Sequence, residues 1–390
     1  MDYDKIIADK AKEMKPSGIR KFFDLAAQMK NVISLGVGEP DFSTPWAIRQ
    51  TAIDTLERKK IVYTANSGMM NLRQEISKYI EKHTGVYYHP ENEMIVTVGG
   101  SEAIDLAIRS IVNPGDEVLI VEPCFVCYEP LVNLSHGIAV PIVTKAENKF
   151  KLTAEELKKA ITPKTKMLIL PYPNNPTGAI MTEEDLKPIV DVLKDTNIMI
   201  LTDEIYSEMT YGRKHCSIIS FPGMKEHTIY VSGFSKTFAM TGWRLGYVTA
   251  PEPILKQMLK IHQYGIMSSP TISQYAAITA LTKCETDVKK MINEYDQRRR
   301  FLVTRLNNMG LECFEPEGAF YVFPSIKSTG LSSEEFCERL LYEGNVAVVP
   351  GNAFGECGEG HIRISYAYSM KHLQTAMNIM QDFITKLKNE

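Results

Sequence analysis

Residues 232–246 read Ser-Gly-Phe-Ser-Lys-Thr-Phe-Ala-Met-Thr-Gly-Trp-Arg-Leu-Gly and follow a short apolar run at 229–231. Lys236 lies among small residues just after this run, and Arg244 comes eight residues later. A lysine at a strand end can condense with an aldehyde, and a nearby arginine can hold a phosphate dianion. Together the two residues suggest pyridoxal phosphate. A lone lysine is more often a solvated surface residue, so this hypothesis depends on the rest of the chain.

Short apolar runs alternate with helix-like segments through most of the chain. A helix-like segment at 101–112, for example, follows the first of these runs. Buried strands separated by helices are typical of a mainly parallel sheet covered on both faces. The sequence therefore predicts an α/β domain. The expected strands lie at 95–98, 117–121, 167–170, 198–202 and 228–231.

The pattern changes after about residue 285. A long charged helix is expected at 287–308, and a final helix from about Met370. Between them, strand-like runs at 318–323, 346–349 and 361–366 alternate in polarity. These elements predict a smaller α+β unit.

Composition and charge are typical of a globular enzyme. The 390-residue chain is 44% hydrophobic and 23% charged, and 44 basic against 47 acidic residues leave a formal charge of -3. This charge gives no broad electrostatic reason to bind nucleic acid or an anionic membrane. The start of the chain, Met1-Asp-Tyr-Asp-Lys, lacks the apolar core of a secretion signal, and no apolar run could cross a bilayer. We therefore expect a cytoplasmic protein that binds neither nucleic acid nor membrane.

Seven cysteines at irregular spacings indicate reduced thiols rather than a disulfide framework. Cys124 and Cys127 form one C-x-x-C pair, which is a pattern of redox and zinc sites. No second pair accompanies it, so ordinary packing is the expected role and no metal site is predicted.

Two further motifs are consistent with a phosphorylated ring. Val98-Gly-Gly-Ser-Glu-Ala103 joins a strand to a helix, where free backbone amides and the helix dipole favour an anion; a simple tight turn explains the glycines about as well. Asp203 ends a strand at the sheet edge where α/β sites gather, and a carboxylate there could keep a pyridine nitrogen protonated. A helix cap or a surface acid is the alternative.

The segment from Gly233 to Gly246 resembles the signature of class I pyridoxal-phosphate aminotransferases. The resemblance runs from Leu35-Gly-Val-Gly-Glu-Pro-Asp-Phe42 to His361-Ile-Arg-Ile-Ser-Tyr-Ala367. It implies fold type I, with a seven-stranded sheet in a large domain at 41–285. A small discontinuous α+β domain would comprise 1–40 and 286–390. It also implies a homodimer with active sites at the subunit interface.

The resemblance implies roles for individual residues. Lys236 would bind the cofactor covalently as a Schiff base and carry the substrate proton, with Asp203 at the ring nitrogen and Tyr206 at the phenolic oxygen. Asn175 would share that oxygen, and Phe125 would stack on the ring. Arg363 would bind the substrate carboxylate, beside Asn175 and the open backbone at Gly38. The implied phosphate contacts are Gly100, Ser101, Glu102, Ser235, Arg244 and, from the neighbouring subunit, Tyr63.

The implied reaction moves an amino group from an L-amino acid to a 2-oxo acid, 2-oxoglutarate on family grounds, by ping-pong kinetics. Some relatives brace the ring aspartate with a histidine where this chain has Tyr128, which leaves the support of Asp203 open. Ser101 replaces a lysine of some aspartate-using relatives, which puts strict aspartate specificity in doubt. Arg20 is a candidate for distal recognition, although an exposed helix arginine is an equal explanation.

Two alternatives stay open at this point. A lyase, such as a β-eliminating enzyme, can use the same fold and cofactor. A pyridoxal-binding transcription regulator is more remote, because only about thirty residues precede the Leu35 segment, too few for a DNA-binding domain.

Overall fold

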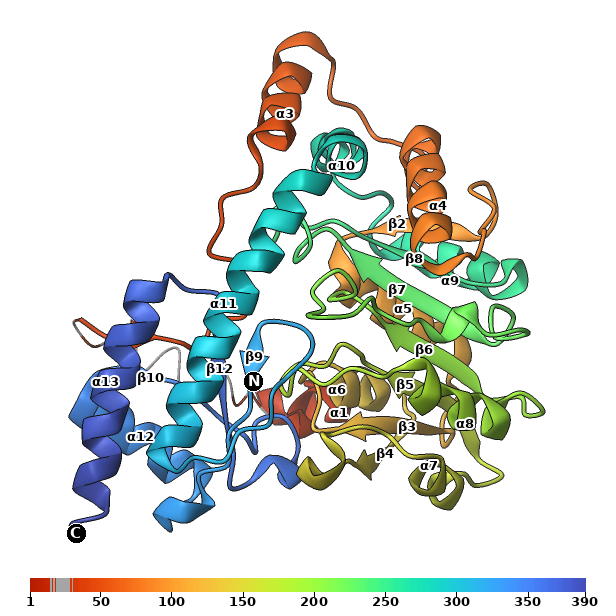
Figure 1. The fold of residues 1–390 in the computed structure, drawn as a ribbon. Coiled ribbons are helices and arrows are strands. Elements are labelled where there is room, and N and C mark those ends of the chain that lie inside the picture. Colours follow the sequence, from red (N-terminus) through yellow and green to blue (C-terminus); the bar gives the residue numbers. More distant parts are fainter. Residues whose placement is uncertain (15, 17, 19–28, 30) are drawn as a thin grey trace.

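A seven-stranded sheet forms the centre of the larger part of the molecule, which we call the large lobe (Figure 1). The computed structural model describes residues 1–14, 16, 18, 29 and 31–390. The strand order is β2-β8-β7-β6-β5-β3-β4; β8 is antiparallel to both neighbours and the other pairs are parallel. The predicted α/β class with a mainly parallel sheet is confirmed. The strands are β2 (Met94–Thr97), β3 (Glu117–Glu122), β4 (Ile138–Val143), β5 (Thr165–Leu170), β6 (Met199–Asp203), β7 (Thr228–Gly233) and β8 (Gly246–Thr249).

Both faces of the sheet are apolar because side chains alternate along each strand. In β5, Met167 and Ile169 join one buried cluster while Leu168 and Leu170 join another. Helices α5, α6 and α9 contribute to the first cluster, and α7 and α8 to the second. These helices are α5 (Gly99–Ile111), α6 (Tyr128–Leu134), α9 (Glu252–Gly265), α7 (Ala154–Ala160) and α8 (Glu183–Leu193).

Local sequence motifs define where several helices of the large lobe begin or end. Thr153 with Glu156 begins α7, and Thr182 with Asp185 begins α8, each as a reciprocal capping box. Helix α4 ends at Gly85, whose φ of 75° closes the last turn. The remaining large-lobe helices are α3 (Trp46–Arg58), α4 (Met70–Thr84) and α10 (Thr271–Lys283).

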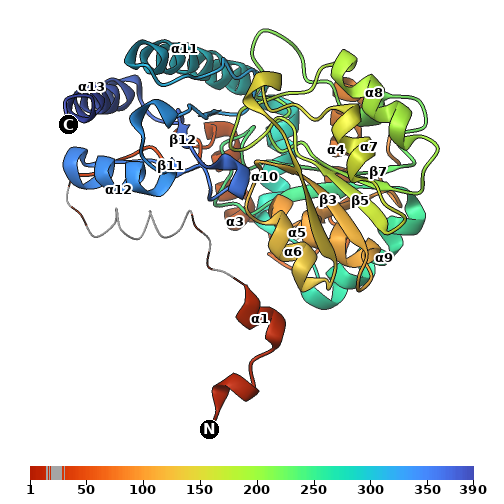
Figure 2. The same cartoon turned by 90° about the horizontal axis from the view of Figure 1, so that it is seen from below.

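A second group of elements, the small lobe, lies beside the carboxyl ends of the central strands (Figures 1 and 2). Its antiparallel sheet has the order β11-β12-β9, and the parallel pair β1–β10 joins the two ends of the chain. Helix α11 is continuous and extends from the large lobe into the small lobe (Figure 1). The elements are β1 (Ile33–Ser34), β9 (Tyr321–Val322), β10 (Val346–Ala347), β11 (Val349–Pro350), β12 (Ile362–Ser365), α11 (Glu285–Met309), α12 (Ser333–Gly344) and α13 (Met370–Leu387).

Short elements complete the described chain. Helix α1 (Asp9–Glu13) lies near the N-terminus and contacts α6 of the large lobe (Figure 1). No helix in the described part of the chain is both long and apolar enough to span a bilayer. Single 3₁₀ turns occur at Tyr3–Lys5, Ala146–Asn148, Ile218–Ser220, Lys327–Thr329 and Glu356–Gly358.

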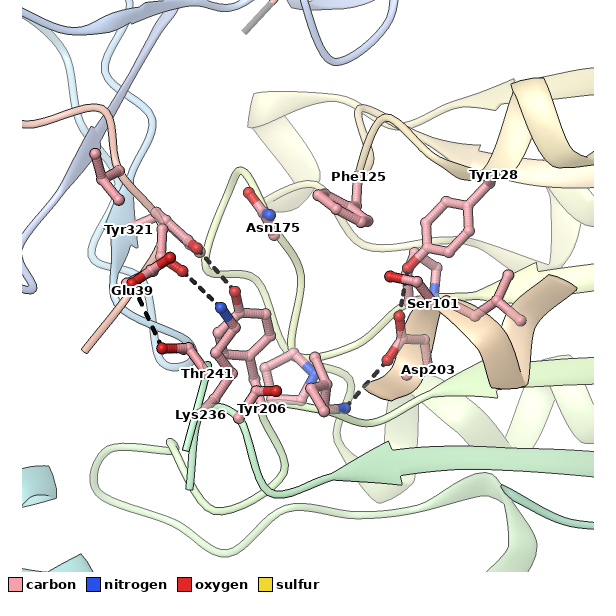
Figure 3. A pocket seen from close by; sticks show the side chains of 18 of the residues that line it. Glu39, Ser101, Phe125, Tyr128, Asn175, Asp203, Tyr206, Lys236, Thr241 and Tyr321 are labelled. Atoms are coloured by element: carbon pink, nitrogen blue, oxygen red, sulfur yellow. Dashed lines mark hydrogen bonds between the residues drawn. The ribbon is translucent and has the colours of Figure 1, made fainter. Parts of the chain in front are cut away.

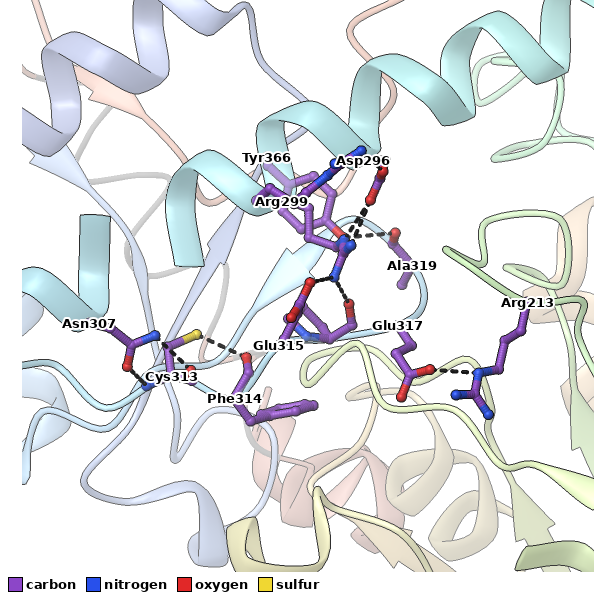
Figure 4. Close-up of polar contacts among 12 residues, drawn as sticks. Arg213, Asp296, Arg299, Asn307, Cys313, Phe314, Glu315, Glu317, Ala319 and Tyr366 are labelled. Atoms are coloured by element: carbon purple, nitrogen blue, oxygen red, sulfur yellow. Dashed lines mark hydrogen bonds and ion pairs between the residues drawn. The ribbon is translucent and has the colours of Figure 1, made fainter. Parts of the chain in front are cut away.

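A polar network fixes α11 to the segment that leads into β9 (Figure 4). The buried guanidinium of Arg299 pairs with Asp296 at 2.6 Å and with Glu315 at 2.7 Å, and donates to the Pro316 carbonyl. The Tyr211 hydroxyl, from the large lobe, donates to the Ala319 carbonyl at 2.5 Å. Because buried polar groups in such a network hold one another in place, β9 has a fixed position beside the central sheet.

Candidate active site

A cavity of about 630 Å³ lies at the carboxyl ends of β5, β6 and β7, beside the small lobe (Figure 3). This is the edge of a parallel sheet where ligands bind. Among the described residues, every site residue proposed from the sequence except Glu102 and Tyr63 lines it. They are Gly38, Gly100, Ser101, Phe125, Asn175, Asp203, Tyr206, Ser235, Lys236, Arg244 and Arg363.

Lys236 projects into this cavity from the turn after β7. Its Nζ donates to the Gly38 carbonyl at 2.6 Å. Burial lowers the pKa of the amine from 10.5 to about 8, with Glu39 opposing the shift and Arg363 and Arg244 adding to it. A larger neutral fraction near neutral pH makes this amine a better nucleophile than an ordinary lysine.

This shift predicts a pH dependence that can be measured without a cofactor. In the protein free of cofactor, labelling of Lys236 by an amine-reactive reagent should rise as the pH passes through about 8, because only the neutral amine reacts. Peptide mass spectrometry gives the rate at each lysine. Lys194 is an internal control, since its pair with Asp191 raises its pKa and delays labelling to higher pH. Identical profiles for the two lysines would contradict the shift.

Asp203 ends β6 and is 8% exposed as a residue. Its Oδ2 accepts from the Tyr128 hydroxyl at 2.8 Å, and its Oδ1 accepts from the Ile205 amide at 3.2 Å (Figure 3). Burial raises the pKa of Asp203, and these two hydrogen bonds oppose that shift. The support that the sequence left open thus comes from the phenol of Tyr128.

Tyr321 is a residue of this cavity that sequence reasoning missed. Its hydroxyl lies 2.8 Å from that of Tyr206, and its ring lies 4.5 Å from the Arg363 guanidinium carbon. A Cβ on Gly38 would come within 2.4 Å of the same hydroxyl, so a side chain is excluded there. The only signal for Tyr321 was its place in the apolar run 319–323, which also fits simple core packing.

Arg363 lies on β12 and is 2% exposed. One terminal nitrogen donates to Asn175 Oδ1 at 2.9 Å and the other to the Gly36 carbonyl. Its Nε has no partner among the described residues. The ring of Phe354, also missed from the sequence, lies 4.8 Å from the guanidinium carbon. A buried guanidinium with an unused donor beside a cavity is suited to a carboxylate.

At the phosphate site predicted at the start of α5, the Arg244 side chain and the Gly246 backbone lie very close to the backbone of Gly99. Gly99 has a φ of 73°, and a Cβ there would lie 2.7 Å from a terminal nitrogen of Arg244. A Cβ on Gly246 would lie 2.6 Å from the Gly99 carbonyl carbon. Glycine at both positions therefore lets the arginine reach the first turn of α5, whose amides lack intrahelical acceptors. Cation and helix N-terminus together form an anion site.

Two of the proposed contacts lie outside the cavity lining. The Glu102 carboxylate accepts from the Val98 amide and from His262, which leaves only its backbone for a phosphate. Tyr63 is 81% exposed. Arg20 lies outside the described residues.

Phe125 lines the cavity beside Asn175 and Asp203 (Figure 3). All seven cysteines, Cys124 and Cys127 included, are free thiols. In the part of the chain that the structure describes, no cluster of acidic, histidine and cysteine side chains could hold a metal ion. The nucleophilic amine, the buried carboxylate, the aromatic lining and the anion site together fit pyridoxal phosphate.

Comparison with known proteins gives consistent matches along the chain. A family model described as "Aminotransferase class I and II" matches residues 30–379. An aspartate aminotransferase of Pyrococcus abyssi is 45% identical over 385 residues, which are 98% of this chain and 99% of the relative. Aromatic-amino-acid aminotransferase 2 of Thermococcus litoralis is 44% identical, with the same coverage of both chains. The solved aromatic aminotransferase of Pyrococcus horikoshii has a TM-score of 0.90 at 43% identity, covering 95% of this chain and 99% of that chain.

Proposed function

The chain belongs to the class I and II aminotransferases and is a pyridoxal-phosphate-dependent aminotransferase, and we propose that it transfers the amino group of an L-amino acid to 2-oxoglutarate by a ping-pong mechanism. One observation carries this proposal: the Lys236 amine and the Arg363 guanidinium line the same cavity. The first can act on a substrate Cα, and the second can hold that substrate's carboxylate. Bound pyridoxal phosphate supplies an electron sink for the carbanion that forms at Cα.

The side chains of the cavity have separable roles in this proposal. Arg363 binds and orients the α-carboxylate, and Asn175, which accepts from Arg363, fixes the guanidinium. Lys236 Nζ removes the Cα proton and later returns a proton. Through its negative charge, Asp203 would keep a proton on the ring nitrogen. The hydroxyl of Tyr206 and the amide of Asn175 would hold the ring's phenolic oxygen. Arg244 and the first turn of α5, with Ser235, would hold the phosphate.

Two-substrate steady-state kinetics test this function. A ping-pong enzyme gives parallel lines in double-reciprocal plots when the amino acid is varied at several fixed 2-oxoglutarate concentrations. Intersecting lines would contradict the mechanism. Release of ammonia with a pyruvate-type product from donors that carry a β-leaving group would instead indicate lyase chemistry.

The similarity does not single out one amino donor, because a relative named for aspartate and one named for aromatic amino acids have nearly the same sequence identity, 45% and 44%. Ser101 lines the cavity where some aspartate-using relatives have a lysine. Without that ion pair, we expect kcat/KM for aspartate to exceed that for aromatic donors by no more than about tenfold. A donor panel with 2-oxoglutarate measures this ratio. A strict aspartate preference would point to another cation of the chain.

We also propose that the protein is a homodimer. Large apolar side chains are exposed on α3, on the loop after it, and at and just after the end of α9; they are Trp46, Leu56, Val62, Tyr63, Tyr264 and Met267. Monomers rarely expose so many neighbouring apolar groups, so a second copy of the chain would cover them and bring Tyr63 to its phosphate site. Within each subunit, we propose a large domain at 41–285 and a small domain of 1–40 with 286–390; the pairing of β1 with β10 supports the second. The free thiols favour a cytoplasmic location.

A further inference from the structure

His262 is buried completely, yet it is polar and lies outside the cavity. It belongs to the last turn of α9, which packs against α5 on the same face of the sheet. Its side chain has no exposed surface, and its Nδ1 lies 2.6 Å from Glu102 Oε1. Burying a polar side chain is unfavourable unless hydrogen bonds offset the lost hydration. The pair with Glu102 does so for Nδ1, whereas Nε2 has no partner among the described residues.

Glu102 connects His262 to the start of α5. Its second oxygen accepts from the amide of Val98, the residue that precedes the helix. A carboxylate in the first turn of a helix otherwise competes for the free amides there. Gly100 and Ser101, whose amides belong to this turn, line the cavity. Two donors therefore hold the Glu102 carboxylate on the side of the turn that faces away from the cavity.

A second contact from the same part of the chain supports the strand that leads into this turn. Ser269, seven residues after His262, is buried and donates through its hydroxyl to the Val96 carbonyl at 2.7 Å. Thr97 donates to the Gly99 carbonyl at 2.9 Å. The junction between β2 and α5 is thus held from outside the cavity, by residues that are not part of its lining.

We propose that His262 is a positioning residue for the cofactor: by fixing Glu102, it keeps the first-turn amides of α5 free and oriented for the phosphate. This inference rests on the phosphate site proposed at α5. It predicts that loss of the Nδ1 donor weakens binding of the phosphate while leaving contacts to the ring unchanged.

Binding of pyridoxal phosphate and of pyridoxal, which lacks the phosphate, separates these effects. With His262→Leu freed of cofactor, we expect the Kd for pyridoxal phosphate to rise about tenfold or more, as for a lost hydrogen bond to a charged group. The Kd for pyridoxal should change by less than about threefold. His262→Asn, whose side-chain amide can replace the Nδ1 donor, should restore most of the affinity. Equilibrium titration followed by absorbance gives all these constants.

Glu102→Gln is the second variant, in case His262→Leu does not fold. It keeps the shape of the side chain but offers one acceptor to two donors, so it should also weaken binding of pyridoxal phosphate selectively. His83→Leu is the matched control, because it removes another histidine–glutamate pair, with Glu208 at 2.7 Å, that is outside the cavity lining. Both constants should stay unchanged in it.

Equal weakening of both ligands, or unchanged affinity in His262→Leu and Glu102→Gln, would overturn the inference. A wild-type protein that does not prefer pyridoxal phosphate to pyridoxal would instead overturn the phosphate site itself. The two failures are therefore distinguishable.

Discussion

Replacing Lys236 with alanine is expected to lower kcat/KM by at least about 10⁴-fold, the upper range for losing a positioned acid–base group. The amine is the one proposed to bind the cofactor covalently and to move the Cα proton. The loss should appear mainly in kcat, because Arg363 and the phosphate site still bind substrate and cofactor. The absorbance band of covalently held cofactor should also disappear. After borohydride treatment, which would make an imine bond to lysine permanent, gel filtration under denaturing conditions should still remove the cofactor from this variant.

Lys225→Ala is the matched control for this variant. Lys225 is also partly buried and pairs with Glu93 at 2.9 Å, but it does not line the cavity. Its kcat/KM should stay within about twofold of the wild type, since no acid–base group is lost. Cofactor that stays covalently attached to Lys236→Ala would show that another lysine is the anchor.

Asp203→Asn is expected to lower kcat by about 10³-fold, the range for removing one preorganised electrostatic group from a site. The neutral amide cannot hold a proton on the ring nitrogen, so the electron sink is weakened. Tyr128→Phe should cost only about tenfold, because it removes one hydrogen bond to the carboxylate and keeps the charge. Without that bond, the pKa of Asp203 should rise further, since the Tyr128 hydroxyl lowers it. The loss in Tyr128→Phe should therefore be greatest at low pH and shrink as the pH rises.

Single-turnover kinetics with a saturating amino donor measure both effects apart from substrate binding. Tyr172→Phe is the control for the tyrosine: Tyr172 is also buried and donates to the Phe150 carbonyl at 2.7 Å, outside the cavity lining. It should change stability and leave the rate and its pH profile unaltered. A Tyr128→Phe enzyme with the wild-type pH profile would mean that Tyr128 does not act on the charge of Asp203.

Much of the fold was predictable because its signals are local. The buried strands of the central sheet are continuous apolar runs, and α11 at Glu285–Met309 is close to the helix expected at 287–308. Residues such as Lys236 and Asp203 could be proposed because each follows or ends a recognisable strand. Their meeting in one cavity depended on the resemblance to a family, since spacing in the sequence does not place one strand end beside another.

What could not be predicted depends on contacts between distant segments. Tyr128 and Asp203 are 75 positions apart, and Tyr206 and Tyr321 are 115 apart. His262 resembles any helix residue until the fold brings it to Glu102. For such residues, identity and local pattern are compatible with plain core packing, and only the tertiary structure shows which polar atoms meet.

The β1–β10 pair has a consequence for how the protein is made. Ile33 and Ser34 leave the ribosome early, but their partners Val346 and Ala347 are synthesised near the end. All strands of the central sheet lie before residue 250, so that sheet can form on the emerging chain while β1 still lacks its partner strand. The small lobe can close only after nearly the whole polypeptide has been translated. A chain truncated before β10 would thus leave an unpaired strand edge, which is a site for aggregation.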